Sequence, residues 1–102
     1  MTNKKIFVDI DETICFYDGV ERRGYKNAIP NYENINKINK LYDEGNEITY
    51  WTARGSVSKI DYRSLTRIQL NSWGCKYHKL SVGEKPDYHL LICDRTKRIE
   101  EL

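Results

Sequence analysis

The sequence predicts an α/β fold with a mostly parallel central sheet. Short apolar runs that read as buried strands alternate with segments of helical periodicity, in the order strand, helix, strand, helix, strand, strand. The first and last runs contain almost no polar residues, as expected for parallel strands that are covered on both faces. With 102 residues the chain has the length of one domain. We therefore treat residues 1–102 as a single domain.

Each expected element has a local signature. The first strand is apolar and β-branched, and the Asp18-Gly19 pair after it predicts a small hairpin, so that residues 14–29 form a flap over the strand ends. Apolar residues at helical spacing predict a helix that begins at Pro30 and Asn31 and ends at Gly45. By the same criteria the strands comprise residues 6–10, 47–51, 76–82 and 90–93, and a second helix, capped by Ser56 or Ser58, runs to Trp73.

Composition narrows the classes of function. The 17 basic and 15 acidic residues are interspersed and give a net charge of +2, which argues against a dedicated binder of nucleic acid or membrane surfaces. Cys15, Cys75 and Cys93 lack CxxC or zinc-finger spacing, which indicates reduced structural thiols. No apolar segment has the length of a signal peptide or membrane span. We expect a cytoplasmic protein without a membrane or nucleic-acid partner.

Two aspartates follow the first expected strand. Asp9 and Asp11 are spaced i and i+2, which in an extended backbone places both carboxylates on the same side. Adjacent anions repel each other unless a cation or a shared proton relieves them. The pair predicts a metal site, an acid/base pair, or both; a solvated turn is the plain alternative.

Polar residues also follow the other expected strands. Thr52 and Arg54 end the second strand, Lys85 lies shortly before the last strand, and Asp94 follows it. The carboxyl ends of parallel strands meet at one edge of a sheet, where open α/β sheets bind their ligands. Thr52 and Lys85 are candidate donors for an anion. Arg54 could be a surface residue, a salt-bridge partner or a clamp for the substrate.

A divalent cation would relieve the gathered carboxylates. Asp9, Asp11 and Asp94 offer hard oxygen ligands, which suit Mg²⁺ together with water and a substrate phosphate. The chain has no cluster of His and Cys that would favour zinc. A phosphoryl group fits both the cation and the donors Thr52 and Lys85.

These residues resemble the haloacid dehalogenase-like (HAD) superfamily of phosphohydrolases. The likeness rests on the DIDET segment of residues 9–13, the strand that ends in Thr52, the downstream Lys85 and the strand that ends in Asp94. It implies a Rossmann-like three-layer sandwich, and the length implies that there is no cap domain. Three further segments are similar to a small capless subgroup that includes capsule-biosynthesis phosphatases: residues 39–45, 52–55 and 73–78.

The resemblance also implies a role for each matched residue. Asp9 would be the nucleophile that forms an aspartyl-phosphate, and Asp11 would protonate the leaving alcohol and later deprotonate the attacking water. Thr52 would bind the phosphoryl group, and Lys85 would offset its charge. Mg²⁺ would be held by the Asp9 carboxylate, the Asp11 carbonyl oxygen and Asp94. In this superfamily an acidic residue often precedes the position of Asp94; here it is Cys93, a departure that would either weaken metal affinity or alter the preferred cation.

We therefore expect a Mg²⁺-dependent phosphatase of a small phosphorylated metabolite, such as a sugar or polyol phosphate. Without a cap domain, the flap of residues 14–29 or a neighbouring subunit would exclude water, which favours a homo-oligomer. Two alternatives stay open. One is a phosphatase of polynucleotide or protein phosphate ends, and the other is a non-catalytic binding module on the same fold.

Overall fold

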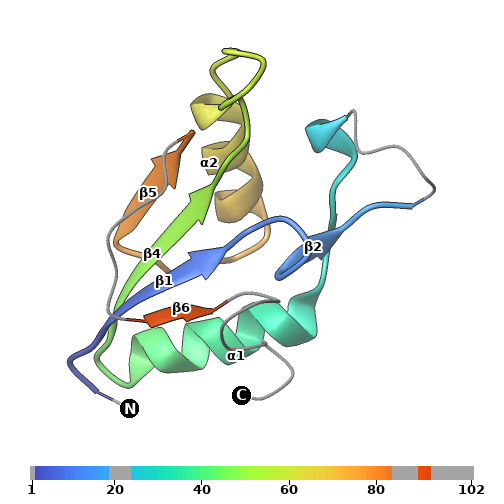
Figure 1. The fold of residues 1–102 in the computed structure, drawn as a ribbon. Helices are drawn as coiled ribbons and strands as arrows, with labels where there is room; N and C mark the ends of the chain where they lie inside the picture. Colours follow the sequence, from blue (N-terminus) through green and yellow to red (C-terminus); the bar gives the residue numbers. More distant parts are fainter. Residues whose placement is uncertain (1, 19–23, 84–89, 93–102) are drawn as a thin grey trace.

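A four-stranded parallel sheet forms the centre of the molecule, in the order β5-β4-β1-β6 (Figure 1). The computed structural model describes residues 2–18, 24–83 and 90–92, and the following description refers to these. Every pairing within this sheet is parallel. The prediction of a Rossmann-like α/β fold with a parallel sheet is therefore confirmed. The strands are β1 (Lys5–Asp9), β4 (Glu47–Thr52), β5 (Lys79–Val82) and β6 (Leu90–Ile92).

The register of β1 decides which residues meet at the carboxyl edge. Val8 pairs with Tyr50 of β4 on one side and with Ile92 of β6 on the other. One residue further, Asp9 pairs with Trp51. The strands therefore end side by side, as parallel pairing requires, and the loops that follow them converge at one edge of the sheet.

Helix α1 (Tyr32–Asp43) begins within two residues of the predicted start, because Pro30 ends a short strand. Asn31 is its N-cap and accepts a hydrogen bond from the main-chain N–H of Asn34 at 3.0 Å. The buried Asn34 side chain donates to the Thr13 carbonyl oxygen at 2.9 Å. The start of α1 is thereby attached to the turn that follows β1.

Helix α2 (Arg63–Ser72) begins later than predicted. Neither Ser56 nor Ser58 caps it; residues 53–62 form a loop, and Tyr62 is the N-cap. Gly55 and Lys59 both have positive φ angles, of 83° and 63°, which an α-helix excludes. Within the described ranges no helix is both long enough and apolar enough to cross a membrane.

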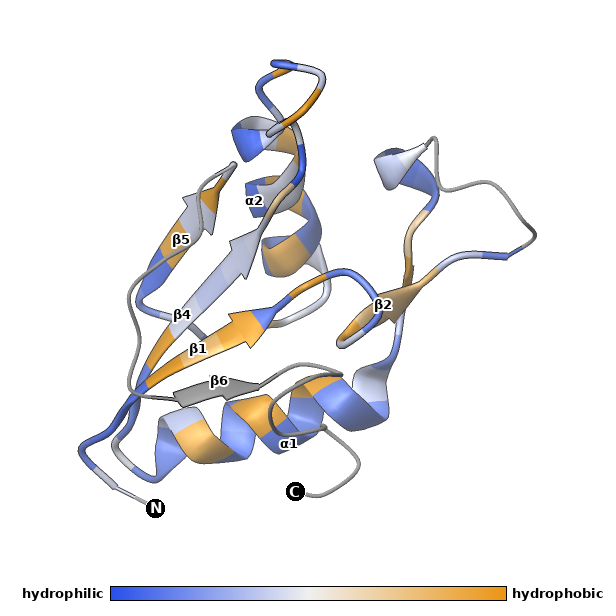
Figure 2. Cartoon of the chain, viewed as in Figure 1, coloured by the Kyte–Doolittle hydropathy of each residue, from blue (hydrophilic) through white to orange (hydrophobic). Residues whose placement is uncertain are grey.

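One core joins the sheet to both helices. Ile6 and Val8 of β1 are fully buried, together with Ile38 of α1 and Leu70 of α2. Figure 2 shows β1 as an apolar strand and α1 with apolar and polar residues on different faces. Both described helices therefore pack on the sheet through one shared apolar core. A second layer of helices, as in a three-layer sandwich, would involve residues outside the described ranges.

The predicted flap is present as a short antiparallel hairpin. Strand β2 (Cys15–Phe16) pairs with β3 (Ile29–Pro30), and the 3₁₀ turn η1 (Tyr25–Asn27) lies between them. The hairpin extends beyond the carboxyl ends of β1 and β4 (Figure 1). It forms one side of the region in which the loops converge.

Replacement of Ile38 by alanine tests the core. The isoleucine is fully buried, so its truncation should lower the free energy of unfolding by about 2–5 kcal/mol through lost apolar contact and a residual cavity. Ile68→Ala on α2 is the matched control, because Ile68 is 65% exposed and should change stability by less than about 0.5 kcal/mol. Urea denaturation measures both; equal effects would contradict this assignment of the core.

Candidate functional site

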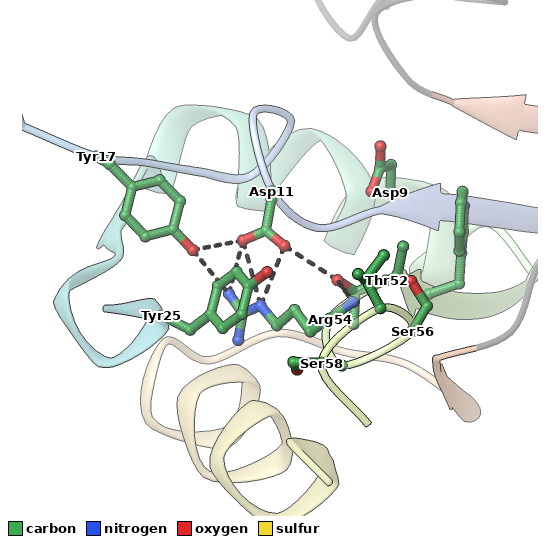
Figure 3. Close-up of a pocket in the computed structure, with 12 residues that line it drawn as sticks. Asp9, Asp11, Tyr17, Tyr25, Thr52, Arg54, Ser56 and Ser58 are labelled. Carbon is green, nitrogen blue, oxygen red and sulfur yellow. Dashed lines mark hydrogen bonds and ion pairs between the residues drawn. The ribbon is translucent and has the colours of Figure 1, made fainter. Parts of the chain in front are cut away.

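A pocket of about 490 Å³ opens at the carboxyl edge of the sheet (Figure 3). Three segments line it. Asp9 and Asp11 come from the end of β1 and its turn, Tyr17 and Tyr25 come from the hairpin, and residues 51–58 come from the end of β4 and the following loop. The predicted convergence of strand ends is therefore found for β1 and β4, the first two strands of the parallel sheet along the chain.

A tight turn follows β1 and presents Asp11. The main-chain N–H groups of Thr13 and Ile14 both donate to the Ile10 carbonyl oxygen, at 3.2 and 3.0 Å, and Glu12 has a φ of 66°. Extended geometry thus ends at Ile10. As a result the carboxylates of Asp9 and Asp11 point in different directions in Figure 3, which corrects the expectation from strand spacing. Both residues still line the same pocket.

The Asp11 carboxylate accepts hydrogen bonds from four side chains, the longest of them from the Cys15 thiol, whose Sγ lies 3.7 Å from Oδ1. Tyr17 Oη donates to Oδ1 at 2.6 Å, and Thr52 Oγ1 donates to Oδ2 at 3.0 Å. Arg54 forms an ion pair through Nη2, at 2.8 Å from Oδ1, and its Nε lies 3.1 Å from Oδ2. Burial alone would raise the pKa of Asp11, but Arg54 foremost, with Tyr17 and Thr52, holds that pKa below the usual 3.8. Asp11 is therefore ionised at neutral pH.

The Arg54 guanidinium is fully buried and uses every N–H group it has. Nη1 donates to Gln69 Oε1 at 2.6 Å and to Thr66 Oγ1 at 3.2 Å. Nη2 donates to Asp11 and to Tyr17 Oη, the latter at 3.3 Å, and Nε donates to Asp11. These contacts account for all five donors of an arginine. Of the three roles that the sequence left open for Arg54, the structure shows the salt-bridge partner.

The surroundings of the ion pair come from the hairpin and from α2. Tyr25 lies with its ring centroid 4.7 Å from Arg54 Cζ, a cation–π distance. Gln69 Nε2 donates to the Tyr25 carbonyl oxygen at 2.7 Å. The sequence analysis missed Thr66 and Gln69, although polar residues three apart on the buried face of an amphipathic helix were a usable signal.

Thr52 lies where the sequence places it, at the end of β4. Its hydroxyl donates to Asp11 and accepts the main-chain N–H of Arg54 at 3.2 Å. Lys85, Cys93 and Asp94 lie outside the described residues, so their predicted roles stay predictions. The last described residue before Asp94 is Ile92, which pairs with Val8 next to Asp9.

The thiols in the described part of the chain are unsuited to nucleophilic chemistry. Burial raises the pKa of Cys15 to about 12, and the neighbouring Asp11 charge contributes to the rise. Burial likewise raises the pKa of Cys75 to about 12. A thiol is a weak nucleophile until it loses its proton, so these residues match the predicted structural role.

The donor atoms near Asp9 suit a hard divalent cation in kind. Asp9 supplies a carboxylate that lines the pocket, and the resemblance assigns the cation to the carbonyl oxygen of Asp11 rather than to its carboxylate. Engagement of the Asp11 carboxylate by Arg54 is compatible with that assignment. Within residues 2–18, 24–83 and 90–92 there is no group of three acidic, His or Cys side chains that could hold a metal. The ligand set that the resemblance implies also includes Asp94, which lies outside the described residues.

Comparisons with known proteins support the fold. No family model matches the chain, and no curated protein matches it. A crystal structure from Vibrio cholerae, described only as an MCSG target, aligns with a TM-score of 0.62 and 28% sequence identity. The alignment covers 84% of this chain and 74% of that chain. That protein has the same kind of α/β architecture, and its description names no activity.

Removal of the Asp11 charge should destabilise the fold. Asp11→Asn leaves the buried Arg54 cation without its anion, and loss of one partner of a buried pair costs about 3 kcal/mol. Asp43→Asn is the matched control, because Asp43 pairs with Lys76 on the surface and such pairs contribute less than about 1 kcal/mol. Urea denaturation at pH 7 compares the two variants. Equal losses would contradict a buried pair at Asp11.

The lowered pKa of Asp11 predicts that the effect of Asp11→Asn on the free energy of unfolding depends on pH. Because the pKa of Asp11 is lowered on folding, its stabilisation is present above the unfolded value near 3.8 and is lost as pH falls through the lower folded value. The difference in unfolding free energy between wild type and Asp11→Asn should therefore shrink when the pH is lowered from 7 to below 3.8. A difference that stays constant over this range would be inconsistent with the shift.

Proposed function

We propose that the protein is a Mg²⁺-dependent phosphatase that hydrolyses a small phosphorylated metabolite through an aspartyl-phosphate on Asp9. The observation that carries the proposal is the pocket at the carboxyl edge of a parallel sheet, which Asp9, Asp11 and Thr52 all line. The resemblance of the DIDET segment to HAD phosphohydrolases agrees with this chemistry. A sugar or polyol phosphate is of a size that suits the pocket.

In the first step an Asp9 carboxylate oxygen attacks phosphorus, and the bond between phosphorus and the alcohol oxygen breaks. In the second step water attacks the aspartyl-phosphate, releases phosphate and restores Asp9. Splitting hydrolysis in this way lets one acid/base group serve both displacements. Asp9, the Asp11 carbonyl oxygen and Asp94 would hold Mg²⁺, which would supply positive charge that offsets repulsion between the anionic substrate and the nucleophile. The positive charge of Lys85 would further offset this repulsion.

Asp11 is the acid and base of the proposed cycle. Its ionised form, which Arg54 favours, is ready to take a proton from the attacking water in the second step. To protonate the leaving alcohol in the first step, Asp11 must first take up a proton. Thr52 donates its one hydroxyl hydrogen to a carboxylate oxygen of Asp11, so in the proposed cycle it would bind the phosphoryl group by exchanging that hydrogen bond.

An open pocket rim gives a second candidate substrate class. Val57 is 92% exposed, and Ser56 and Ser58 beside it in the loop are also exposed. Among the described residues this part of the rim is exposed, so a phosphate at the end of a polynucleotide or on a protein side chain can also enter. Small metabolites and macromolecules differ only in the group that carries the phosphate, so one panel of substrates separates the two classes.

A substrate panel tests the proposal. Sugar and polyol phosphates, 5′- and 3′-phosphorylated oligonucleotides and a phosphopeptide are incubated with and without Mg²⁺, and released phosphate is measured. We expect Mg²⁺-dependent release from a sugar or polyol phosphate and a loss of more than about 10³-fold in kcat/KM for Asp9→Asn. Asp43→Asn, on the surface, should keep wild-type turnover. Turnover of only the oligonucleotides or the phosphopeptide would select the second class, and no turnover at all would favour a binding module.

A further inference from the structure

We propose that Arg54 is a positioning residue, anchored by Thr66 and Gln69 of α2, that fixes the orientation of the Asp11 carboxylate in the pocket. The inference rests on the proposed function, because Asp11 is the acid and base of that cycle. It assigns Arg54 to the catalytic aspartate rather than to the substrate.

The geometry of the contact is that of a two-point clamp. Arg54 Nη2 lies 2.8 Å from Asp11 Oδ1, while Nε lies 3.1 Å from Oδ2 and 3.3 Å from Oδ1. A planar guanidinium that contacts both oxygens fixes the plane of the carboxylate as well as its position. A lysine ammonium could supply the charge but not this directional hold.

The other end of the guanidinium is held by helix α2. Thr66 Oγ1 donates to the Tyr62 carbonyl oxygen at 2.7 Å, so its remaining acceptor capacity faces Arg54. Gln69 accepts from Arg54 through Oε1 and donates through Nε2 to the hairpin at Tyr25. Neither side chain can turn away without leaving a buried polar group unpaired, which costs about 1–3 kcal/mol. Arg54 is thus fixed by a helix that contributes no carboxylate to the site.

A direct role of Arg54 in holding the substrate phosphate fits these contacts poorly. All five of its N–H groups already have acceptors, and its side chain has no exposed surface. A phosphate could gain a hydrogen bond from Arg54 only by displacing Asp11 or by breaking the anchor on α2. Asp11 therefore faces the pocket, with 17% of its side chain exposed, whereas the Arg54 side chain that holds it is fully buried.

The separation of kcat from KM tests this role. Arg54→Lys keeps the charge and loses the clamp, so we expect kcat on the best substrate of the panel to fall about 10²-fold with KM within about 3-fold of wild type. Thr66→Val with Gln69→Met removes the anchor, together with the Gln69 hydrogen bond to the hairpin, and leaves the contacts between Arg54 and Asp11 in place. It should lower kcat by a smaller factor, again without a change in KM. This second variant keeps the inference testable if Arg54→Lys fails to fold, and thermal unfolding monitors the fold of both.

A double-mutant cycle with Asp11→Asn gives the second readout. If Arg54 acts through Asp11, Arg54→Lys should cost little further kcat once the carboxylate is absent. A rise in KM at unchanged kcat would show a substrate clamp, and an equal loss of kcat with and without Asp11 would show a general structural effect; either result overturns the inference. Wild-type kcat in both Arg54→Lys and the anchor variant would also overturn the inference. The proposed function would remain intact in that case, provided that turnover still depends on Asp9. Absence of turnover in the wild type would overturn both.

Discussion

The ion pair between Asp11 and Arg54 is the interaction on which the organisation of the pocket depends. Removing two charges from water costs several kcal/mol, and the cost is recovered only when the geometry is good and the remaining polar groups are satisfied. Here Tyr17 and Thr52 complete the carboxylate, while Thr66 and Gln69 complete the guanidinium. The pair therefore joins four segments that are far apart in sequence: the turn after β1, the hairpin, the end of β4 and helix α2.

Such an arrangement is typical of a site rather than of a core. An apolar replacement of the same volume would avoid the cost of desolvation, so stability alone does not account for the presence of the pair. It holds one carboxylate in a fixed plane at the wall of a pocket that Asp9, the last residue of β1, also lines. In the proposed hydrolysis Asp9 is the phosphoryl acceptor, and Asp11 is an acid/base group whose orientation is fixed by Arg54.

Periodicity and turn chemistry predicted most of the fold. The parallel sheet, the start of α1 to within two residues and a flap after the first strand follow from local patterns that tertiary packing did not override. The start of α2 did not, because two positive φ angles extend the loop past the serines that would otherwise cap a helix. The i, i+2 spacing of the aspartates predicted that they share a pocket, but the turn at Ile10 ends the extended geometry on which a common direction depends. The buried setting of Arg54 was not predicted, since it depends on contacts 12 and 15 residues away on α2, for which the polar pair on that helix was the available signal.

The account is tested most directly by a crystal structure of the protein soaked with Mg²⁺ and beryllofluoride, a mimic of a phosphoryl group. It predicts beryllofluoride density joined to an Asp9 carboxylate oxygen, with the Asp11 carboxylate still held by Arg54 beside it. Density on another side chain, or none in the pocket that Asp9 and Asp11 line, would contradict the assignment of this edge of the sheet as a phosphoryl-transfer site.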